Sequence, residues 1–286
     1  MLGFYIFAFV FAAVIIAVGK YTGMPVRKDA NLEAGAGLTI AFIVLVMGAW
    51  IAATYGKTIE SRLLSPIILP SPMEVLRAFP VLHYKQALVR SVLISFGRIT
   101  SGFALATIIA LPLGVQMAAY PKIAAFFRPL ALIGGYVPIV VFIPLSLAWF
   151  GIGETQKVGF LFIGCFVVLL PGVIRAIQDV PDDYLNLAAT KGASQWQLVS
   201  NVMLPVAAPA IWNSLRAVYG VGWGWIILAE IVNGDRGMGY LISISERRGQ
   251  TASTYAVIIV ICVIAVICDQ VWRRIGESMF PYMKKD

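Results

Sequence analysis

Residues that commonly carry catalysis or bind metals are scarce in this chain. Its 286 residues include one histidine, His83, and three cysteines. Cys165, Cys262 and Cys268 all lie inside apolar stretches and do not have the spacing of a zinc site or a disulfide framework. The sequence also has no Walker-type phosphate loop. We therefore expect no catalytic residues, no metal and no cofactor in this chain, and any nucleotide chemistry would belong to another chain.

Charged residues are also few. They make up 13% of the chain, whereas 60% of the residues are hydrophobic and the mean hydropathy is +0.86. Soluble domains average about 25% charged and about 45–50% apolar residues, so this composition predicts an all-α, polytopic transmembrane helical bundle. The net charge of +8 does not indicate nucleic-acid binding, because no soluble basic face carries it. We assign it to loop lysines and arginines beside membrane lipids with an anionic inner leaflet.

The apolar stretches predict about seven membrane spans. They are Leu2–Val18, Leu38–Thr54, Leu88–Ala119, Pro129–Phe150, Val158–Ile177, Ala207–Val232 and Tyr255–Trp272. The first stretch has no positive charge before it and Lys20 after it, which is the wrong polarity for a cleaved signal peptide and favours a retained span. Pro138 and Pro144 predict a broken helix within the fourth stretch.

The polar segment Asp179–Pro205 stands out among these spans, and it predicts two short helices. Pro181 suits a first helical position, and Gly192 suits a left-handed cap at the end of the first helix. Ser194 and Gln197 have the spacing of a capping box that opens the second helix. Pro205 is expected to end it.

Apolar side chains follow one face of each predicted helix. Tyr184, Leu187 and Ala188 share a face of the first helix, and Trp196 lies on the apolar face of the second. This pattern is typical of a hairpin that presses against another protein. An ordinary loop at the membrane interface is the alternative interpretation. Lysines and arginines are slightly more numerous in the loops on the hairpin side, which favours a cytoplasmic hairpin.

Three charged side chains within predicted spans are candidate functional groups. Arg98 lies on a polar face with Ser91 and Ser95, where it could attract an anion or extend its guanidinium to the membrane interface. Glu230 is an acid within a span, so it is either a site residue or a structural partner of a neighbouring helix. Asp269 is expected to pair with a basic residue one helical turn later in the chain, Arg273.

The hairpin resembles the cytoplasmic loop of the permeases of type I ATP-binding-cassette importers. That loop has the pattern Glu-Ala-Ala, three residues, Gly, nine residues, Ile-x-Leu-Pro. Ala188, Gly192 and the run Val202 to Pro205, which includes Leu204, match this pattern, whereas Asn186 replaces the glutamate and Leu187 replaces the first alanine. Because the family's glutamate makes a charged contact with the ATPase, Asp182 or Asp183 is expected to replace that contact.

Further motifs are similar to those of the nitrate, sulfonate and taurine branch of this family, over roughly residues 66–275. They are Leu69-Pro70-Ser71-Pro72, Ser91 to Arg98 with Gly102-Phe103 and Pro112-Leu113-Gly114, Trp149 to Glu154 with Lys157-Val158, and Gly237 to Ile242. The resemblance implies the type I permease fold and divides the chain into regions. These are N-terminal spans (1–54), an outer loop with short amphipathic pieces (55–89), a permease core (90–275) containing the coupling helices (179–205), and a cytoplasmic tail (276–286).

The resemblance also implies function and partners. The chain would be the permease subunit of an importer in the bacterial inner membrane, taking up a small anion. Its partners would be two copies of an ATPase that bind ATP and Mg²⁺, a second permease subunit (here a second copy of this chain) and a substrate-binding protein. The residues expected to contact the ATPase are Asp182, Asp183, Tyr184, Asn186, Leu187, Ala188, Gly192, Trp196, Leu204 and Pro205. The residues expected along the translocation path are Arg98, Tyr136, Pro138, Phe142, Pro144, Gly222, Trp223 and Glu230.

Two other classes of function compete with this interpretation. An ion-driven secondary transporter would show broken spans in matched halves and buried acids along its path, and only Glu230 and Asp269 are available as such acids. A membrane-embedded enzyme would need a cluster of histidines and acids at the bilayer face. The single histidine does not support this class.

Overall fold

The computed structural model describes residues 32–56, 58 and 61–283, so the predicted span Leu2–Val18 lies outside the described part. The chain divides into two units, Met1–Ala53 and Thr54–Asp286, and each is described by itself. Helices are the regular secondary structure of the described residues, which confirms the all-α prediction. In the first unit, α2 (Leu32–Thr54) is an apolar helix of 23 residues. At 1.5 Å per residue it is about 35 Å long, enough to cross a hydrocarbon core of about 30 Å.

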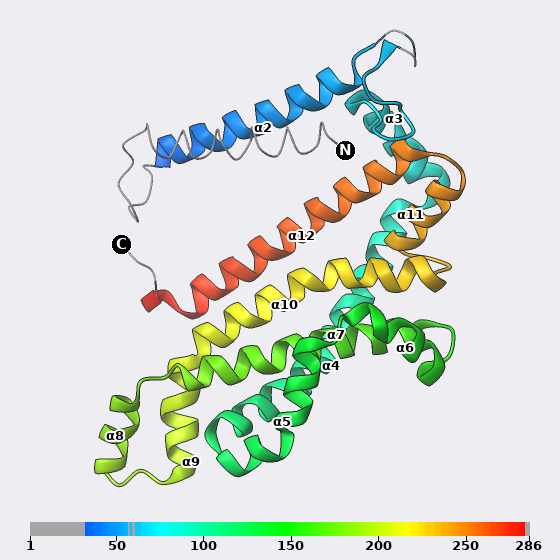
Figure 1. Cartoon of the computed structure of the whole chain (residues 1–286). Helices are drawn as coiled ribbons and strands as arrows, with labels where there is room; N and C mark the ends of the chain where they lie inside the picture. The colour runs from blue at the N-terminus through cyan, green and yellow to red at the C-terminus, as the bar shows by residue number, and fades with distance from the viewer. Residues whose placement is uncertain (1–31, 57, 59–60, 284–286) are drawn as a thin grey trace. The chain divides into compact units, whose positions relative to one another are not determined.

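The second unit is a helical bundle (Figure 1). Its helices are α3 (Pro72–Gln86), α4 (Leu88–Ala119), α5 (Pro121–Tyr136), α6 (Phe142–Phe150), α7 (Glu154–Gln178), α8 (Asp182–Thr190), α9 (Gln195–Leu198), α10 (Leu204–Asn233), α11 (Met238–Arg247) and α12 (Thr251–Met279), joined in part by the short turns η2 (Ile139–Val141), η3 (Val199–Met203) and η4 (Pro281–Met283).

The predicted number of seven spans is not confirmed. Within the described residues, five helical stretches are long and apolar enough to cross a membrane: α2, α4, α7, α9 to α10, and α12. The predicted span Pro129–Phe150 is instead divided between α5 and α6, and the chain is non-helical at Pro138 between them. Pro144 does not break a helix, because it lies in the first turn of α6, where an amide hydrogen is not needed.

The seam between α4 and α7 is built from small residues. Gly102, Ala106, Ala110 and Gly114 recur every four residues along α4, and all four are buried. A Cβ atom added at Gly102 would lie 2.5 Å from Leu161 Cβ, and one added at Gly114 would lie 2.8 Å from Val173 Cγ1. Because lipid gives helices no hydrophobic drive to associate, this close backbone approach supplies the van der Waals contact that holds the two helices together.

The short helix α3 is anchored to the rest of its unit by polar contacts at its first residues. Ser71 and Glu74 form a capping box, and Arg62 Nη1 donates to Glu74 Oε1 at 3.0 Å. Partial burial tends to raise the pKa of the Glu74 carboxyl, but hydrogen bonds from the Ser71 amide and from Arg62 outweigh it and lower that pKa. The carboxylate therefore stays ionised where it joins the loop to the helix.

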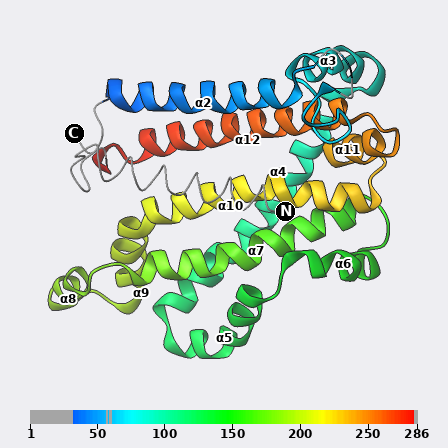
Figure 2. The same cartoon turned by 45° about the horizontal axis from the view of Figure 1, so that its top comes forward.

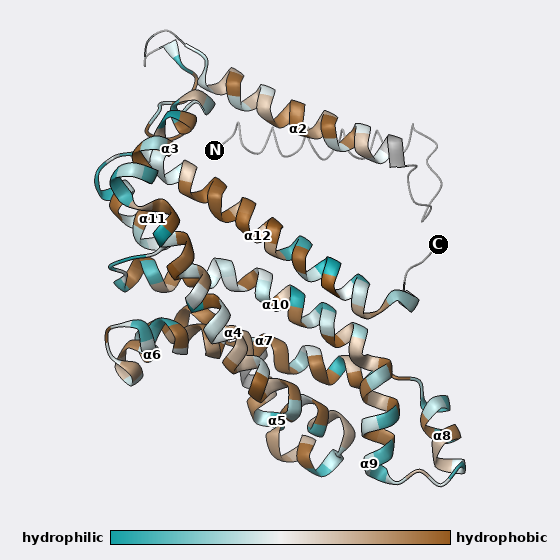
Figure 3. Ribbon diagram, turned by 180° about the vertical axis from the view of Figure 1, so that it is seen from behind, coloured by the Kyte–Doolittle hydropathy of each residue, from teal (hydrophilic) through white to brown (hydrophobic). Residues whose placement is uncertain are grey.

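The bundle has two distinct ends. Figures 1 and 2 show α8 and α9 at one end of the long helices, and α3, α6 and α11 at the opposite end. Hydrophilic residues gather on α8 and α9 and again around α11, whereas the first half of α12 is hydrophobic (Figure 3). We call these the hairpin end and the α11 end. The two candidate sites described next lie at these two ends.

Candidate functional site

A buried network of charged side chains lies at the α11 end and joins α4, α7, α10 and α11. Arg98 Nη1 donates to Glu230 Oε1 at 2.7 Å and to the carbonyl oxygen of Arg236 at 2.8 Å. Its Nε donates to Glu154 Oε2 at 2.6 Å, and its Nη2 also contacts the Glu154 carboxylate. Arg98 is 3% exposed and Glu230 is fully buried, whereas Glu154 is 63% exposed. One end of the network is thus sealed and the other reaches the surface.

The first residues of α11 form a cradle around the Glu230 carboxylate. Gly239 N donates to Glu230 Oε2 at 2.9 Å, while Ser95 Oγ donates to Glu230 Oε1 at 2.8 Å and accepts from Met238 N at 2.9 Å. Gly237 has a φ of +107°, and a Cβ atom there would lie 2.3 Å from the Glu230 carboxylate. The buried Glu230 carboxylate therefore accepts a hydrogen bond from a free backbone amide at the start of α11. Its negative charge is also favourable at this positive end of the helix dipole.

This network changes the interpretation of two predicted path residues. The Arg98 guanidinium is enclosed by two carboxylates and a carbonyl, so its charge is paired within the protein. Glu230 has the structural pairing that was one of its two alternatives. Ser91 and Ser95 are buried on the same face of α4, so the predicted polar face points into the protein. The predicted pairing of Asp269 with Arg273 is wrong, because Asp269 accepts two hydrogen bonds from Arg216, at 2.5 and 2.6 Å.

At the hairpin end, α8 and α9 form the predicted helical hairpin. Gly192 has a φ of +84° after the last turn of α8, and Ser194 and Gln197 form a complete capping box at the start of α9. Asp182 and Asp183 occupy the first turn of α8, which begins one residue later than predicted because Pro181 is its N-cap. The hairpin is thus held by local hydrogen bonds and backbone geometry.

The apolar side chains of the hairpin are exposed. Tyr184 is 52% exposed, Leu187 58% and Trp196 60%, and Asn186 on α8 is also exposed. Ala188 and Gly192 line a hollow of about 380 Å³ between α8 and α9. Large apolar side chains gathered on a polar hairpin are a common feature of protein–protein contacts.

Pro205 does not end the second helix of the hairpin. A π turn, η3, follows α9 and leads directly into α10, so that Gln195–Asn233 forms one helical stretch of 39 residues. Leu204 and Pro205 are the first residues of α10, and the proline's missing amide hydrogen falls at the junction with the π turn. The hairpin is therefore in helical continuity with a membrane span.

The remaining predicted path residues lie in two separate places. Around the Pro138 break, Tyr136 is 83% exposed, Pro144 is exposed and Phe142 packs partly against a core of Ile143, Phe160 and Ala229. Trp223 is buried, with its ring 6.3 Å from that of Phe96. Gly222 lies beside Ile99, where an added Cβ would have a contact of 3.5 Å. The structure brings Arg98 and Glu230 together, but it does not join them to the residues around the break.

Two features of functional interest were not assigned a role from the sequence. Glu154 completes the charged network, and its distance of 56 residues from Arg98 in the chain hid the pairing. The small residues at every fourth position of α4 form the seam with α7, a signal that was readable in the sequence. Among the described residues, no group of three or more His, Cys, Asp or Glu side chains could hold a metal ion.

Comparison with known proteins identifies the family. Residues 102–276 match the model of the binding-protein-dependent transport system inner membrane component family. This chain belongs to that family. It is 31% identical to a protein of Methanocaldococcus jannaschii described as an ABC transporter permease, over 77% of this chain and 84% of that protein. It is 29% identical to the taurine transport system permease protein of Escherichia coli, over 90% of this chain and 92% of the relative.

Other relatives place the chain in the predicted branch of the family. The aliphatic sulfonates transport permease of Bacillus subtilis is 25% identical over 76% of this chain and 79% of its own, and the nitrate import permease of Synechococcus elongatus is 26% identical over 66% and 69%. Among solved structures, the inward-facing MetNI methionine ABC transporter matches with a TM-score of 0.62 and 20% identity, over 70% of this chain and 97% of the matched one. The fold is that of type I ABC importer permeases, as predicted.

Proposed function

We propose that this chain is the membrane subunit that couples ATP hydrolysis on a separate ATPase to the uptake of a small anion. Two ATPase copies carry ATP and Mg²⁺, a second copy of this chain completes the translocation path, and a substrate-binding protein delivers the solute. The assembly lies in the bacterial inner membrane with the hairpin of α8 and α9 on the cytoplasmic side. Membership of the inner membrane component family supports this proposal.

The observation that carries the proposal is the combination of exposure and rigidity in the hairpin. Tyr184, Leu187 and Trp196 present apolar surface to a partner. Behind them, the capping box at Ser194 and the helical continuity into α10 leave little freedom at the base of the hairpin. A displacement of the hairpin is thus transmitted to a membrane span as movement of a connected element, which is what coupling to an ATPase requires.

The acidic contact of the family motif has a candidate replacement on α8. Asn186 stands in place of the usual glutamate and carries no charge. Asp182 and Asp183 lie one turn earlier on α8, and both are exposed. We assign them the charged contact with the ATPase.

The substrate class follows from the relatives and remains part of the proposal. The relatives named for taurine, aliphatic sulfonates and nitrate all transport small anions or zwitterions with an anionic group. Gly220 and Gly224 on α10 have nothing within 4 Å of an added Cβ, so this face leaves room for a second copy beside the path. We assign path roles to Tyr136, Pro138, Phe142 and Pro144 at the break and to Gly222 and Trp223 on α10.

An ion-driven mechanism has no support in the arrangement of acids. Glu230 is paired with Arg98, and Asp269 is paired with Arg216. Each of these candidate ion-binding carboxylates of the described spans thus already has a cationic partner.

The proposal is tested by co-purification. The tagged chain is expressed with its ATPase, extracted in detergent, and the retained ATPase is quantified. We expect Trp196→Ala and Gly192→Val to lose most of the retained ATPase, the first by removing an apolar contact and the second by straining a position with φ of +84°. Phe126→Ala on α5, where the side chain is 77% exposed, is the matched control and should retain the ATPase. Equal retention by all three variants would count against the proposal.

A further inference from the structure

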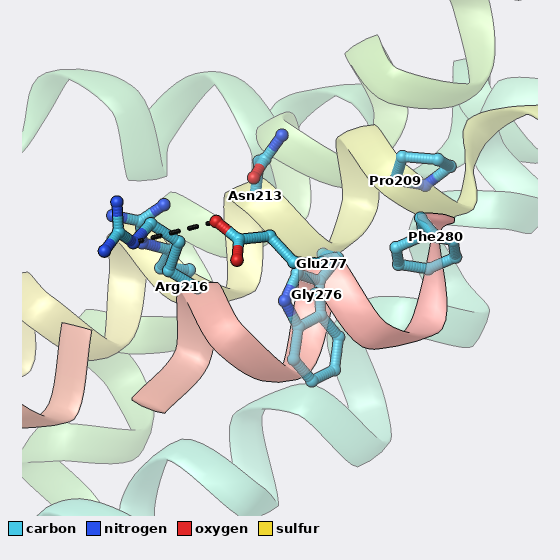
Figure 4. A pocket seen from close by; sticks show the side chains of 8 residues that line it. Pro209, Asn213, Arg216, Gly276, Glu277 and Phe280 are labelled. Carbon is cyan, nitrogen blue, oxygen red and sulfur yellow. Dashed lines mark ion pairs between the residues drawn. The ribbon is translucent and has the colours of Figure 1, made fainter. Parts of the chain in front are cut away.

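A cavity of about 250 Å³ lies between α10 and α12 towards the hairpin end, apart from both sites described above. Figure 4 shows Asn213 and Arg216 on α10, Glu277 near the end of α12, and Phe280, the residue that follows α12. Its lining residues are Pro209, Trp212, Asn213, Arg216, Arg273, Gly276, Glu277 and Phe280. Two arginines and two aromatic residues in one cavity between membrane spans indicate a ligand with an anionic group and an apolar part.

The position of this cavity across the membrane can be estimated by counting residues along both helices. Arg216 is 17 residues from the end of α10 at Asn233, which is about 26 Å at 1.5 Å per residue. Arg273 is 22 residues from the start of α12 at Thr251, which is about 33 Å. Both helices have their other end at the α11 end, and the hydrocarbon core is about 30 Å thick. Counted along α12, Arg273 lies just past the opposite boundary of the hydrocarbon, where lipid phosphate groups lie. Counted along α10, the backbone of Arg216 lies about 4 Å short of that boundary, a distance that its long side chain can span.

The cavity offers hydrogen-bond donors that the protein does not use. Arg216 binds Asp269 through Nε and Nη2, and Arg273 Nη2 donates to Gln270 at 2.7 Å. This leaves Nη1 of both arginines without a hydrogen bond within the described residues. The Asn213 side chain, which is exposed, likewise has no hydrogen bond there. Guanidinium groups present paired donors that match phosphate oxygens.

Two acidic groups, Asp269 (paired with Arg216) and Glu277, oppose the binding of an anion in this cavity. Glu277 lines it, and its Oε1 lies 3.9 Å from Arg273 Nε. Both side chains are 49% exposed, so the contact is long and open to water, and such a pair contributes little. A phosphate oxygen in the same place would approach Arg273 at hydrogen-bond distance and displace the carboxylate towards solvent.

A tryptophan packed against a glycine forms one wall of the cavity. Gly276 lies against Trp212, and a Cβ atom there would be 2.6 Å from Trp212 Nε1. Trp212 Nε1 donates to the carbonyl oxygen of Trp272 at 3.0 Å. Because this polar atom already has a partner, Trp212 offers a ligand only apolar ring surface. Trp212 and Phe280 together give the cavity an aromatic lining, and aromatic side chains are enriched where proteins meet lipid at membrane interfaces.

We propose that this cavity binds the phosphate group of an anionic phospholipid of the hairpin-side leaflet. Arg273 and Arg216 contact the phosphate, Asn213 donates to it, and Trp212 and Phe280 flank the glycerol and acyl part. The cytoplasmic leaflet carries the anionic lipids, so the side of the membrane rests on the proposed function, whereas the phosphate site rests on the cavity alone. Because the cavity begins at Pro209, four residues after Pro205, a bound lipid would lie beside the helix that connects the hairpin to the membrane.

The test is native mass spectrometry of the full chain in detergent, titrated with phosphatidylglycerol or with phosphatidylcholine. The readout needs neither ATPase nor substrate, so its result is independent of the proposed coupling. We expect tighter binding of phosphatidylglycerol than of phosphatidylcholine. Arg273→Gln should weaken binding of phosphatidylglycerol about fivefold, since one basic group near the surface contributes about that factor. Glu277→Gln should strengthen it, because a competing carboxylate is removed.

Arg274→Gln is the matched control, since Arg274 is exposed, carries the same charge and does not line the cavity. It should bind phosphatidylglycerol as the unmodified chain does. Equal losses for Arg273→Gln and Arg274→Gln, or no preference over phosphatidylcholine, would overturn the proposal. A parallel titration with inorganic phosphate separates the sources of the phosphate group. Retention of phosphatidylglycerol in millimolar phosphate supports the lipid, and its complete displacement would overturn the lipid in favour of a soluble phosphate.

Discussion

Arg98 of α4 and Glu230 of α10 form a buried ion pair, with 2.7 Å between Nη1 and Oε1. The two residues are 132 positions apart in the chain, and both side chains are closed off from solvent. Ser95, Gly239 and the carbonyl oxygen of Arg236 complete their hydrogen bonds. The pair therefore holds the α11 end of the bundle together.

Removing one member of this pair is expected to lower the stability of the bundle strongly. Glu230→Gln leaves the Arg98 guanidinium with less compensation, and breaking a buried pair typically costs about 3–5 kcal/mol. The measurement is the unfolding midpoint of the detergent-solubilised chain, compared with that of Glu154→Gln. Glu154 is 63% exposed, so water replaces its contact with Arg98 and the loss should be much smaller. Similar midpoints for the two variants would contradict this ranking.

The seam between α4 and α7 predicts a contrast between two glycines of one helix. Gly102→Ala places a methyl group 2.5 Å from Leu161 Cβ and should destabilise the bundle by about 1–3 kcal/mol, as overpacking does. Gly97→Ala meets nothing within 4 Å and should leave stability unchanged or raise it by up to about 1 kcal/mol. Unfolding midpoints of the two variants check this. A Gly102→Ala chain as stable as Gly97→Ala would show that the helices do not meet as described.

The anchoring of α3 should depend on pH. The pKa of Glu74 is lowered in the folded chain, so the carboxylate stabilises the fold above the unfolded value of 4.5, and that contribution is lost as the pH falls through the folded value. Hydrogen exchange of α3 amides should therefore rise as the pH falls from about 5 to about 3, relative to an intrinsic-rate reference. Glu74→Gln should remove this pH dependence. A similar rise in the variant would assign the effect to another group.

The sequence predicted the hairpin well because its determinants are local. The capping box of Ser194 and Gln197 spans three residues, and the left-handed turn at Gly192 depends on that residue's own φ. The bounds of α4 agree with the apolar stretch Leu88–Ala119 for the same reason. Hydrophobic periodicity and capping residues carry information about neighbouring turns of one helix. That local information is sufficient to predict the hairpin and the bounds of α4.

The partners of charged groups could not be predicted in the same way. Asp269 has Arg273 one helical turn away, yet it pairs with Arg216, 53 residues earlier, because α10 and α12 lie side by side. Arg98 similarly finds Glu154 and Glu230 on two other helices. Pro205 was expected to end a helix, but the preceding π turn places it where an amide hydrogen is not needed. Each of these outcomes depends on which helices meet, which local patterns do not specify.

The central proposal, that the hairpin is a cytoplasmic contact for the ATPase, is tested most directly by sided labelling. A single cysteine is introduced at Tyr184, which is 52% exposed, in a chain whose three native cysteines are replaced. A second chain carries its cysteine at Tyr84 on α3, which is 84% exposed at the opposite end. Both are treated with a membrane-impermeant maleimide in inside-out and right-side-out vesicles, with and without the ATPase.

The account predicts that the cysteine at position 184 reacts only in inside-out vesicles and is protected when the ATPase is present. The cysteine at position 84 should react only in right-side-out vesicles, with no effect of the ATPase. Reaction of position 184 in right-side-out vesicles, or equal reaction with and without the ATPase, would contradict the account.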